Sequence, residues 1–329
     1  MRKSPKSISN FRDETIKRLT DEVVGMLDQV DEKNWTLPWN SGNVRALQPL
    51  NPLSGSRYHG INWLVLATLA GATGRHRDEE SSFTSARFAT YKQWTAAGCQ
   101  VRAGSTGIPL VYFKQFAAKE TGPNEVQTEE KGKGGAMLKA FTVFAAEQVD
   151  GAEKYLPDTT VVAENGFDTC RFLTDLGVVV EYGSDRAAAL GDGSYIMMPL
   201  SESFVSREAY IATLFHEVTH WSKKHVGRDD YLVKNFTDLK ERYAFEELVA
   251  ELGSTMLSGV FGIRSSAQPG NVQYLKSWLG ALRNDRSYLL KAASKAQQAV
   301  DWILSKVGDP NAVADADAVA EEQEAEALV

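Results

Sequence analysis

Two histidines four residues apart constrain the fold of this chain more than any other feature of its sequence. They lie in the run His216-Glu217-Val218-Thr219-His220. On an α-helix, side chains at positions i and i+4 project from the same face, with their Cβ atoms about 5–6 Å apart. That separation suits two bonds of about 2.0–2.1 Å to a single zinc ion. The fold must therefore place this helix where both imidazoles can share one cation.

The residues around the histidine pair favour a helix that begins near Ser206 and buries one side. Ser206 is a suitable N-cap, and Glu208 lies near the positive end of the helix dipole. The predicted buried side consists of Ile211, Leu214, Phe215 and Val218. Because the bare motif also arises by chance, these flanks are what favour a metal site over a structural coincidence.

Glu217 follows the first histidine directly and would point at the open coordination position of a bound metal. A carboxylate in that position can take a proton from a metal-bound water, which is the general-base role in motifs of this kind. The motif thus predicts a metal-dependent hydrolase site of the zincin type, with Glu217 as the catalytic base. The expected cofactor is Zn²⁺, with Mn²⁺ as the alternative.

A catalytic zinc usually takes a third protein ligand, and His225 is the nearest further histidine. It follows His220 by five residues, whereas the pattern with three histidines needs six and a glycine that turns the chain. We therefore reject His225 as a ligand and keep only a pocket-lining role for it.

A second helix, predicted over 243–251, supplies carboxylates that could complete the site. Glu247 shares one helical face with Ala250 and Ser254, whose small side chains permit close approach of the histidine helix. We predict Glu247 as the third ligand and Glu251, one turn on, as an outer partner of the site. Glu246 is the alternative ligand, and the competing interpretation is that these glutamates are solvated surface residues.

Two further expectations concern the substrate side of the site. The predicted strand at 194–198 precedes the histidine helix and could be an exposed edge that pairs with an extended peptide, which would make proteins the substrates. Tyr243, on the same helical face as Glu247, could donate to an oxyanion, but a buried core tyrosine is the stronger interpretation.

The first half of the chain interleaves aromatic and cationic residues. Residues 1–135 carry 18 Lys and Arg against 14 Asp and Glu, whereas the remainder carries 18 against 29. Single-stranded nucleic acids need such a mixture, because bases stack on rings while cations hold the phosphates. Several of these aromatics could equally be core residues. The predicted DNA contacts are Trp39, Arg57, Tyr58, Asn62, Tyr91, Lys92, Trp94 and Arg102.

The composition excludes several other classes of protein. No apolar stretch reaches the roughly 20 residues of a membrane-spanning helix. The basic residues at the N-terminus are followed by polar residues, not by the apolar core of a secretory signal, so we expect a cytoplasmic protein. Cys99 and Cys170 are too far apart in sequence to form a paired-cysteine metal clip, and they make no disulfide framework.

The length of 329 residues indicates two domains, and the pattern of elements indicates an α+β fold. We expect a mixed α/β domain that binds single-stranded DNA over residues 1–145, with a polar, Gly-rich loop or linker near 119–135. A zincin-like metallopeptidase domain is expected over 146–307. Residues 308–329 contain seven acidic and no basic residues, which predicts a disordered tail.

Several of these segments together resemble a known family. The run 49–62 and the run 90–104 resemble the single-stranded-DNA-binding domain of ArdC-like antirestriction proteins, a module that also opens TraC-type conjugative primases. The runs 215–222 and 245–252 are similar to the zincin-like metallopeptidase domain that accompanies it. The resemblance covers about residues 8–305.

This resemblance implies a plasmid- or phage-type protein that coats incoming single-stranded DNA and protects it from restriction. It implies His216, His220 and Glu247 as metal ligands and Glu217 as the catalytic acid and base. Expected partners are single-stranded DNA, double-stranded DNA and a protein substrate bound on DNA, with no membrane. The chain departs from the family in its polar insertion, in its acidic tail, and in Lys223-Lys224, where the family often has Gly-His. These departures put the substrate contacts in doubt.

Three functions remain open from the sequence. The first is a DNA-binding metallopeptidase, and the second is a DNA-coating protein in which the metal only holds the fold. The third, acidic mimicry of DNA, ranks last because the acidic residues are scattered or confined to the tail.

Overall fold

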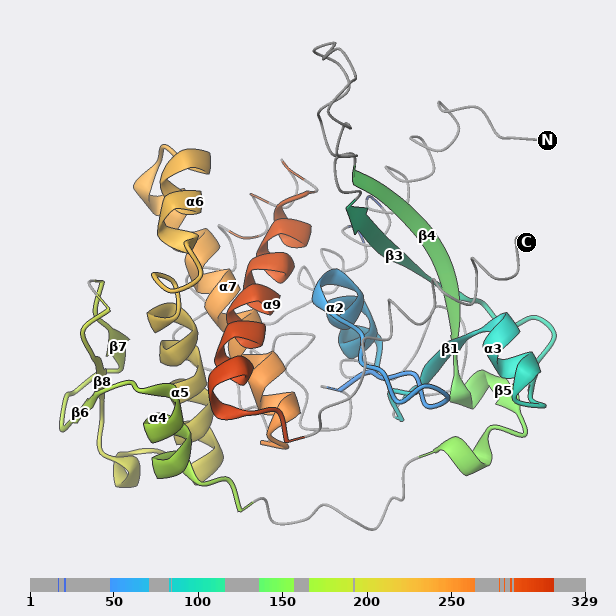
Figure 1. Cartoon of the computed structure of the whole chain (residues 1–329), viewed down its shortest axis with the longest axis horizontal. Helices are drawn as coiled ribbons and strands as arrows, with labels where there is room; N and C mark the ends of the chain where they lie inside the picture. Colours follow the sequence, from blue (N-terminus) through green and yellow to red (C-terminus); the bar gives the residue numbers. More distant parts are fainter. Residues whose placement is uncertain are drawn as a thin grey trace, which may run out of the picture.

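Figure 1 shows the chain as a computed structural model, which describes residues 48–70, 83, 85–115, 136–156, 166–191, 193–263, 278, 281, 285 and 287–310, together with Lys17 and Asp21. Trp39, the polar segment at 119–135 and residues 311–329 of the acidic tail lie outside these residues. The predictions made for them stay predictions.

The first half is built around an antiparallel sheet and one buried helix. Strands β1 (Phe88–Thr90), β4 (Ala136–Ala145) and β3 (Ile108–Gln115) form the sheet in the order β1-β4-β3. In Figure 1 the long β3–β4 hairpin rises beside α2 (Gly60–Thr68). The apolar side chains of Val65 and Leu66 pack with those of the sheet in one core cluster.

A smaller unit follows the first strand. Thr90 caps α3 (Tyr91–Ala96) in a reciprocal pair with Gln93, which stabilises the start of this short helix. Strand β2 (Gln100–Val101) pairs with β5 (Val149–Asp150), which is flanked by two 3₁₀ turns, η3 (Ala146–Gln148) and η4 (Glu153–Tyr155). The packing of the first half thus continues past residue 145, where the sequence placed the domain boundary.

The second half is mainly helical. Helix α4 (Thr169–Leu176) precedes a small sheet of β6 (Val180–Tyr182), β7 (Ala188–Ala189) and β8 (Ile196–Met198), and the 3₁₀ turn η5 (Ser201–Ser203) leads to α5 (Arg207–Trp221). In the part of the chain that the structure describes, α6 (Arg228–Asn235), α7 (Leu239–Val260) and α9 (Ser287–Val307) follow. Ser206 caps α5 by accepting a hydrogen bond from the Ala209 amide, so the predicted helix start is confirmed.

The small sheet corrects the prediction made for the strand at 194–198. The order of the sheet is β6-β8-β7, so β8 is the central strand and pairs with a neighbour on each side. A central strand has no free backbone groups for a peptide. The edge strand next to the histidine helix is β7 instead.

Helices α5, α7 and α9 lie side by side, with α2 beyond α9 (Figure 1). One large core cluster includes residues of all four helices, so the packing joins the two halves of the chain. The α+β fold class is confirmed. Among the described residues, no helix combines the length and the apolar character that crossing a membrane would require.

The crossing of α5 and α7 depends on small side chains, as the sequence predicted for this helix pair. The Ser254 hydroxyl donates to the Ala212 carbonyl oxygen at 2.8 Å. A Cβ atom built on Gly253 would lie 2.6 Å from Thr219 Cγ2 and 2.8 Å from Thr219 Oγ1, too close for any real contact. Gly253 is therefore what allows α7 to approach the segment between the two histidines.

Replacing Gly253 by alanine should destabilise the protein. Overpacking against Thr219 costs about 1–3 kcal/mol, and the gain of about 1 kcal/mol in helix propensity offsets only part of it. Urea unfolding of the metal-free protein measures the change. The control is Gly166→Ala, because nothing lies within 4 Å of a Cβ there. Equal stability of the two variants would contradict the close helix crossing.

Candidate metal centre

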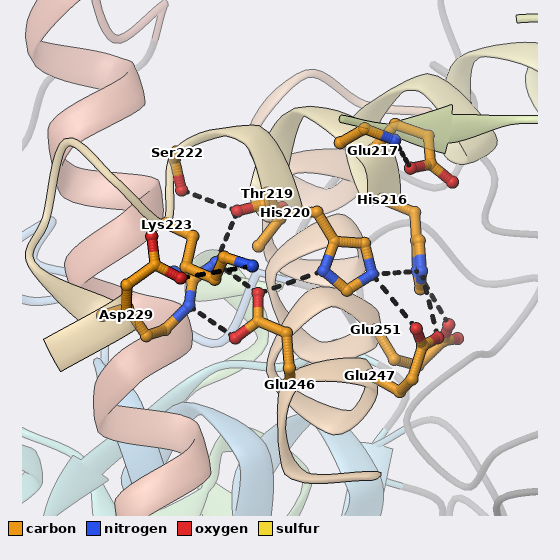
Figure 2. Close-up of polar contacts among 12 residues, drawn as sticks. His216, Glu217, Thr219, His220, Ser222, Lys223, Asp229, Glu246, Glu247 and Glu251 are labelled. Atoms are coloured by element: carbon orange, nitrogen blue, oxygen red, sulfur yellow. Dashed lines mark hydrogen bonds and ion pairs between the residues drawn. The ribbon is translucent and has the colours of Figure 1, made fainter. Parts of the chain in front are cut away.

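Helices α5 and α7 bring two histidines and one glutamate together at a single point. The Nε2 atoms of His216 and His220 lie 3.1 Å apart. The Glu247 carboxylate reaches both rings, with one oxygen 3.5 Å from His216 Nε2 and the other 3.5 Å from His220 Nε2. Figure 2 shows both imidazoles directed at this carboxylate.

The spacing of these atoms fits one small cation. Ligand atoms bonded at about 2.0–2.2 Å to a tetrahedral ion lie about 3.3–3.6 Å from one another. Here the three ligand atoms lie within 4.8 Å of one another, and the side chains are largely buried. Two imidazole nitrogens and one carboxylate are a donor set of catalytic zinc sites. The residues present therefore fit a divalent metal.

His220 is held from its other ring nitrogen by a buried charge pair. Glu246 Oε1 lies 3.0 Å from His220 Nδ1. The same carboxylate accepts two hydrogen bonds of 2.8 Å from Arg228, which is fully buried and also donates to the Thr219 carbonyl oxygen at 2.6 Å. Such a partner fixes the tautomer and the ring orientation of a metal-binding histidine. Glu246 thus lies behind the ligand, not at the metal position.

The site concentrates negative charge around the two rings. Burial lowers the pKa of His216, but contacts with Glu247 and Glu251 and the charge of Glu217 raise it more strongly, to about 10. Burial likewise lowers the pKa of His220, whereas Glu246 and Glu247 raise it above the usual value. For Glu246, burial raises the pKa, but Arg228 and His220 lower it to about 2. A divalent cation bound between these groups can balance the negative charge of the carboxylates, as protons on the histidines do in its absence.

Glu251 takes the outer position predicted for it. Its Oε2 lies 3.6 Å from His216 Nδ1, which is buried and has no hydrogen-bond partner among the described residues. The distance is slightly longer than a hydrogen bond. Glu251 therefore lies nearest to the other ring nitrogen of His216, as Glu246 does for His220.

Glu217 lies beside His216 on α5, with its carboxylate turned toward the small sheet (Figure 2). Its Oε2 accepts a hydrogen bond of 2.7 Å from the amide of Ala189 in β7, and the side chain is buried. The strand β7 thus holds this carboxylate next to the cluster. The site joins a buried carboxylate, an edge strand and a candidate metal position.

Two other residues near the motif lie outside the site. The His225 ring stacks on Trp302, with centroids 4.5 Å apart and an interplanar angle of 14°, which agrees with its rejection as a ligand. Tyr243 is 53% exposed, so its interpretation as a buried core tyrosine is wrong. Tyr243 lies on α7 one turn before Glu247, and its side chain faces solvent.

Three of the predicted DNA contacts are core residues, which corrects those predictions. Trp94 is fully buried, and its indole N–H donates to the Phe144 carbonyl at 3.1 Å. The Tyr58 hydroxyl donates to the Phe88 carbonyl at 2.9 Å. Asn62 exchanges two hydrogen bonds with the backbone of Val111, at 2.6 and 2.9 Å. The polar groups of all three side chains therefore serve the fold, and their burial argues against the stacking and base contacts expected of them.

Of the other predicted DNA contacts, the four that the structure describes lie at the surface or close to it. Tyr91 is 47% exposed, and Lys92 beside it on α3 is exposed as well. Arg102, next to β2, is exposed and pairs with Asp150 at 3.3 Å. The Arg57 side chain is only 12% exposed, because its guanidinium binds the Asp309 carboxylate at 2.7 Å.

Arg228 is the residue of this site that sequence reasoning missed. It begins a separate helix, and nothing in its local sequence marks it as part of the site. The available signal was the pair Glu246-Glu247, because consecutive residues of a helix face different directions. If Glu247 faces the histidines, a buried Glu246 needs a cation of its own.

Comparisons with known proteins match both halves of the chain. A model of the N-terminal domain of anti-restriction factor ArdC matches residues 13–144, and a model of zincin-like metallopeptidases matches residues 168–295. The Sinorhizobium fredii protein y4eC is 30% identical over 299 residues, which cover 89% of this chain and 92% of that protein. The Escherichia coli DNA primase TraC is 32% identical over 316 residues, but the match spans only 27% of the primase.

Two solved structures of the antirestriction protein ArdC from the R388 plasmid are also similar. The metal-free structure has a TM-score of 0.67 at 31% identity, over 89% of this chain and 97% of the other. The Mn(II)-bound structure has a TM-score of 0.65 at 31% identity, over 90% of this chain and 98% of the other.

Proposed function

Because the chain belongs to the ArdC family of antirestriction proteins, we propose that it binds single-stranded DNA and cleaves peptide bonds at a metal-dependent site. The observation that supports the peptidase is the convergence of His216, His220 and Glu247, with Glu217 next to the first histidine. In this proposal the part up to about residue 156 binds DNA, the part from there to 307 is the peptidase, and the protein acts in the cytoplasm.

We propose Zn²⁺ as the metal, held by His216, His220 and Glu247. A bound divalent cation would supply Lewis acidity, which polarises a carbonyl group and acidifies water. The related R388 protein has been solved with Mn(II), so Mn²⁺ is the alternative. The buried groups behind the ligands, Glu246 and Glu251, hold the two imidazoles in place.

Glu217 provides the proton transfers. Its carboxylate accepts a proton from the water that attacks the peptide carbonyl carbon, and it delivers that proton to the departing amine as the C–N bond breaks. The Ala189 amide keeps the carboxylate in position. Because β7 is the edge strand beside Glu217, we propose that an extended peptide lies along β7 and that the substrates are proteins bound on DNA.

For the DNA-binding half we propose the exposed surface formed by Tyr91, Lys92 and Arg102. An exposed ring can stack on a base, and the two cations can bind phosphates. We propose single-stranded DNA as the preferred partner and double-stranded DNA as a weaker one, since stacking on a protein ring requires unpaired bases.

Binding of single-stranded DNA by the full-length chain should weaken as salt rises, because each phosphate contact contributes about 0.7 to the slope of log affinity against log salt. Tyr91→Ala should cost about 1–3 kcal/mol of binding free energy. Lys92→Gln should lower the salt slope. Fluorescence anisotropy with an oligonucleotide measures both, with Lys234→Gln on α6 as the control. Affinity independent of salt and of Tyr91 would contradict the proposed surface.

The second candidate function is a DNA-coating protein without peptidase activity, in which the metal only stabilises the fold. It is favoured by the position of the metal site, because the site ties α5 to α7 within the large core cluster. Protection from restriction that does not depend on Glu217 would support this alternative.

A further inference from the structure

A cavity lies between the two halves of the chain, away from the metal site. Its volume is about 550 Å³, within the range of small-molecule sites. It lies between the start of α2, strand β3, helix α6 and helix α9. None of its lining residues belongs to the metal cluster. We call it the α2–α9 cavity.

One cation of the α2–α9 cavity has no acidic partner. The Lys295 ammonium lies 4.3 Å from the centre of the Tyr231 ring and donates to Gln298 Oε1 at 3.1 Å. Among the described residues no carboxylate pairs with it. Burial, and then the charge of Arg228, lower the pKa of Lys295. A partly buried cation in this situation favours an anionic ligand.

The remaining charges of the cavity have the same sign or are neutral. Lys291, one turn before Lys295 on α9, also lines it, although its ammonium already binds the Asp285 carboxylate at 2.9 Å. His59 lines the opposite wall, and no lining residue is acidic. An anion that enters the cavity therefore meets no lining carboxylate.

The walls offer flat rings and amide groups. Tyr112 of β3 and Tyr231 of α6 both line the cavity and are partly exposed. Gln297 and Gln298 contribute side-chain amides. Gln297 accepts a hydrogen bond of 3.0 Å from the Gly60 amide and donates one of 2.8 Å to the Asp301 carboxylate, which lies outside the lining, so the Gln298 amide is the one offered to a ligand. The set of groups is thus a cation, two aromatic rings and amides without acid, which matches a phosphate joined to a heterocyclic base.

We propose that the α2–α9 cavity binds one nucleotide unit of single-stranded DNA, with its phosphate at Lys295 and its base against the tyrosine rings. This inference rests on the proposed function, because it assigns a second contact to the same DNA. Since the cavity lies between α2 and α9, a strand bound there contacts the DNA-binding half and the peptidase half together. DNA would thereby be held next to the domain that carries the metal site.

Lys295→Gln in the full-length chain tests this assignment, with Lys306→Gln as the control because it removes the same charge from the same helix outside the cavity. We expect Lys295→Gln to weaken binding of oligothymidylate about tenfold and to lower the salt slope by about 0.7, the value for one phosphate contact. Lys306→Gln should stay within about twofold of the unsubstituted protein. Equal affinities of the two variants would overturn the inference.

Two further measurements distinguish a failure of the cavity assignment from a failure of the proposed DNA binding. Photocrosslinking of an iodouracil oligonucleotide to the unsubstituted protein should label the peptide that contains Tyr112 or Tyr231, and labelling only elsewhere would overturn the inference without any variant. The second measurement is binding of thymidine monophosphate. If Lys295→Gln weakens binding of this nucleotide but leaves binding of the oligonucleotide unchanged, the cavity is a site for a free nucleotide, and the inference is overturned. If the unsubstituted protein binds no single-stranded DNA at all, the proposed function itself fails.

Discussion

Replacing Glu217 by glutamine should reduce peptide cleavage by a factor of roughly 10²–10⁴, because an amide cannot accept the proton of the attacking water. The substitution keeps the size of the side chain and an oxygen that can still accept from the Ala189 amide. Metal binding and DNA binding should therefore remain unchanged. Cleavage of a fluorogenic peptide library, metal analysis and oligonucleotide anisotropy measure the three properties on one preparation.

The control for this substitution is Glu241→Gln, which neutralises an exposed carboxylate in the first turn of α7. It should leave all three properties intact. Full cleavage by the Glu217→Gln protein would refute Glu217 as the base. Undiminished protection of DNA from restriction by the same variant would favour the non-catalytic, DNA-coating function instead.

Replacing Arg228 by methionine should lower the free energy of unfolding of the metal-free protein by about 3–5 kcal/mol, because it leaves the buried Glu246 carboxylate without its charge partner. Metal affinity should also fall by about 10–100-fold, since Glu246 would no longer hold His220 in one orientation. Urea unfolding measures the first effect and competition with a chelator the second. Lys223→Met, which breaks a partly exposed pair with Asp229, should cost at most about 1 kcal/mol.

A double variant separates the role in positioning His220 from a purely structural one. Arg228→Met combined with Glu246→Leu removes both buried charges, and replacing such a pair by apolar residues is often close to neutral for stability. Stability should therefore recover while metal affinity stays low, because His220 Nδ1 has lost its acceptor. If both stability and metal affinity recovered, the Arg228–Glu246 pair would have a structural role alone and no role in positioning His220.

The parts of this protein that were predictable from its sequence are those that depend on local geometry. Four residues of helix place His216 and His220 on one face, and a single cap at Ser206 begins that helix. The same periodicity put Glu247 on a face with Ser254, and the structure brings that face against α5. Local rules suffice here because each depends only on residues within two turns.

Burial of the aromatic residues was decided by partners far away in the chain. Trp94 donates to Phe144, fifty residues later, and Asn62 on α2 pairs with the backbone of Val111 in β3. A ring at helical spacing has the same local pattern whether it faces the core or a base. The sequence pattern therefore could not show that three of the predicted DNA contacts are buried in the fold.

Contacts between residues far apart in the sequence likewise decided which strand lies beside Glu217 and which cation pairs with the buried Glu246 carboxylate. A strand pattern at 194–198 does not reveal how many neighbours the strand has, and the structure places β7, not β8, at the edge beside Glu217. Arg228, the first residue of α6, reaches Glu246 on α7 and the Thr219 carbonyl oxygen on α5, and neither contact is visible in its local sequence. The helix period by itself placed the two imidazoles on one face, with the Glu217 carboxylate next to the first of them. Tertiary packing alone decided which buried groups support them, because desolvation and charge pairing depend on every residue around a group.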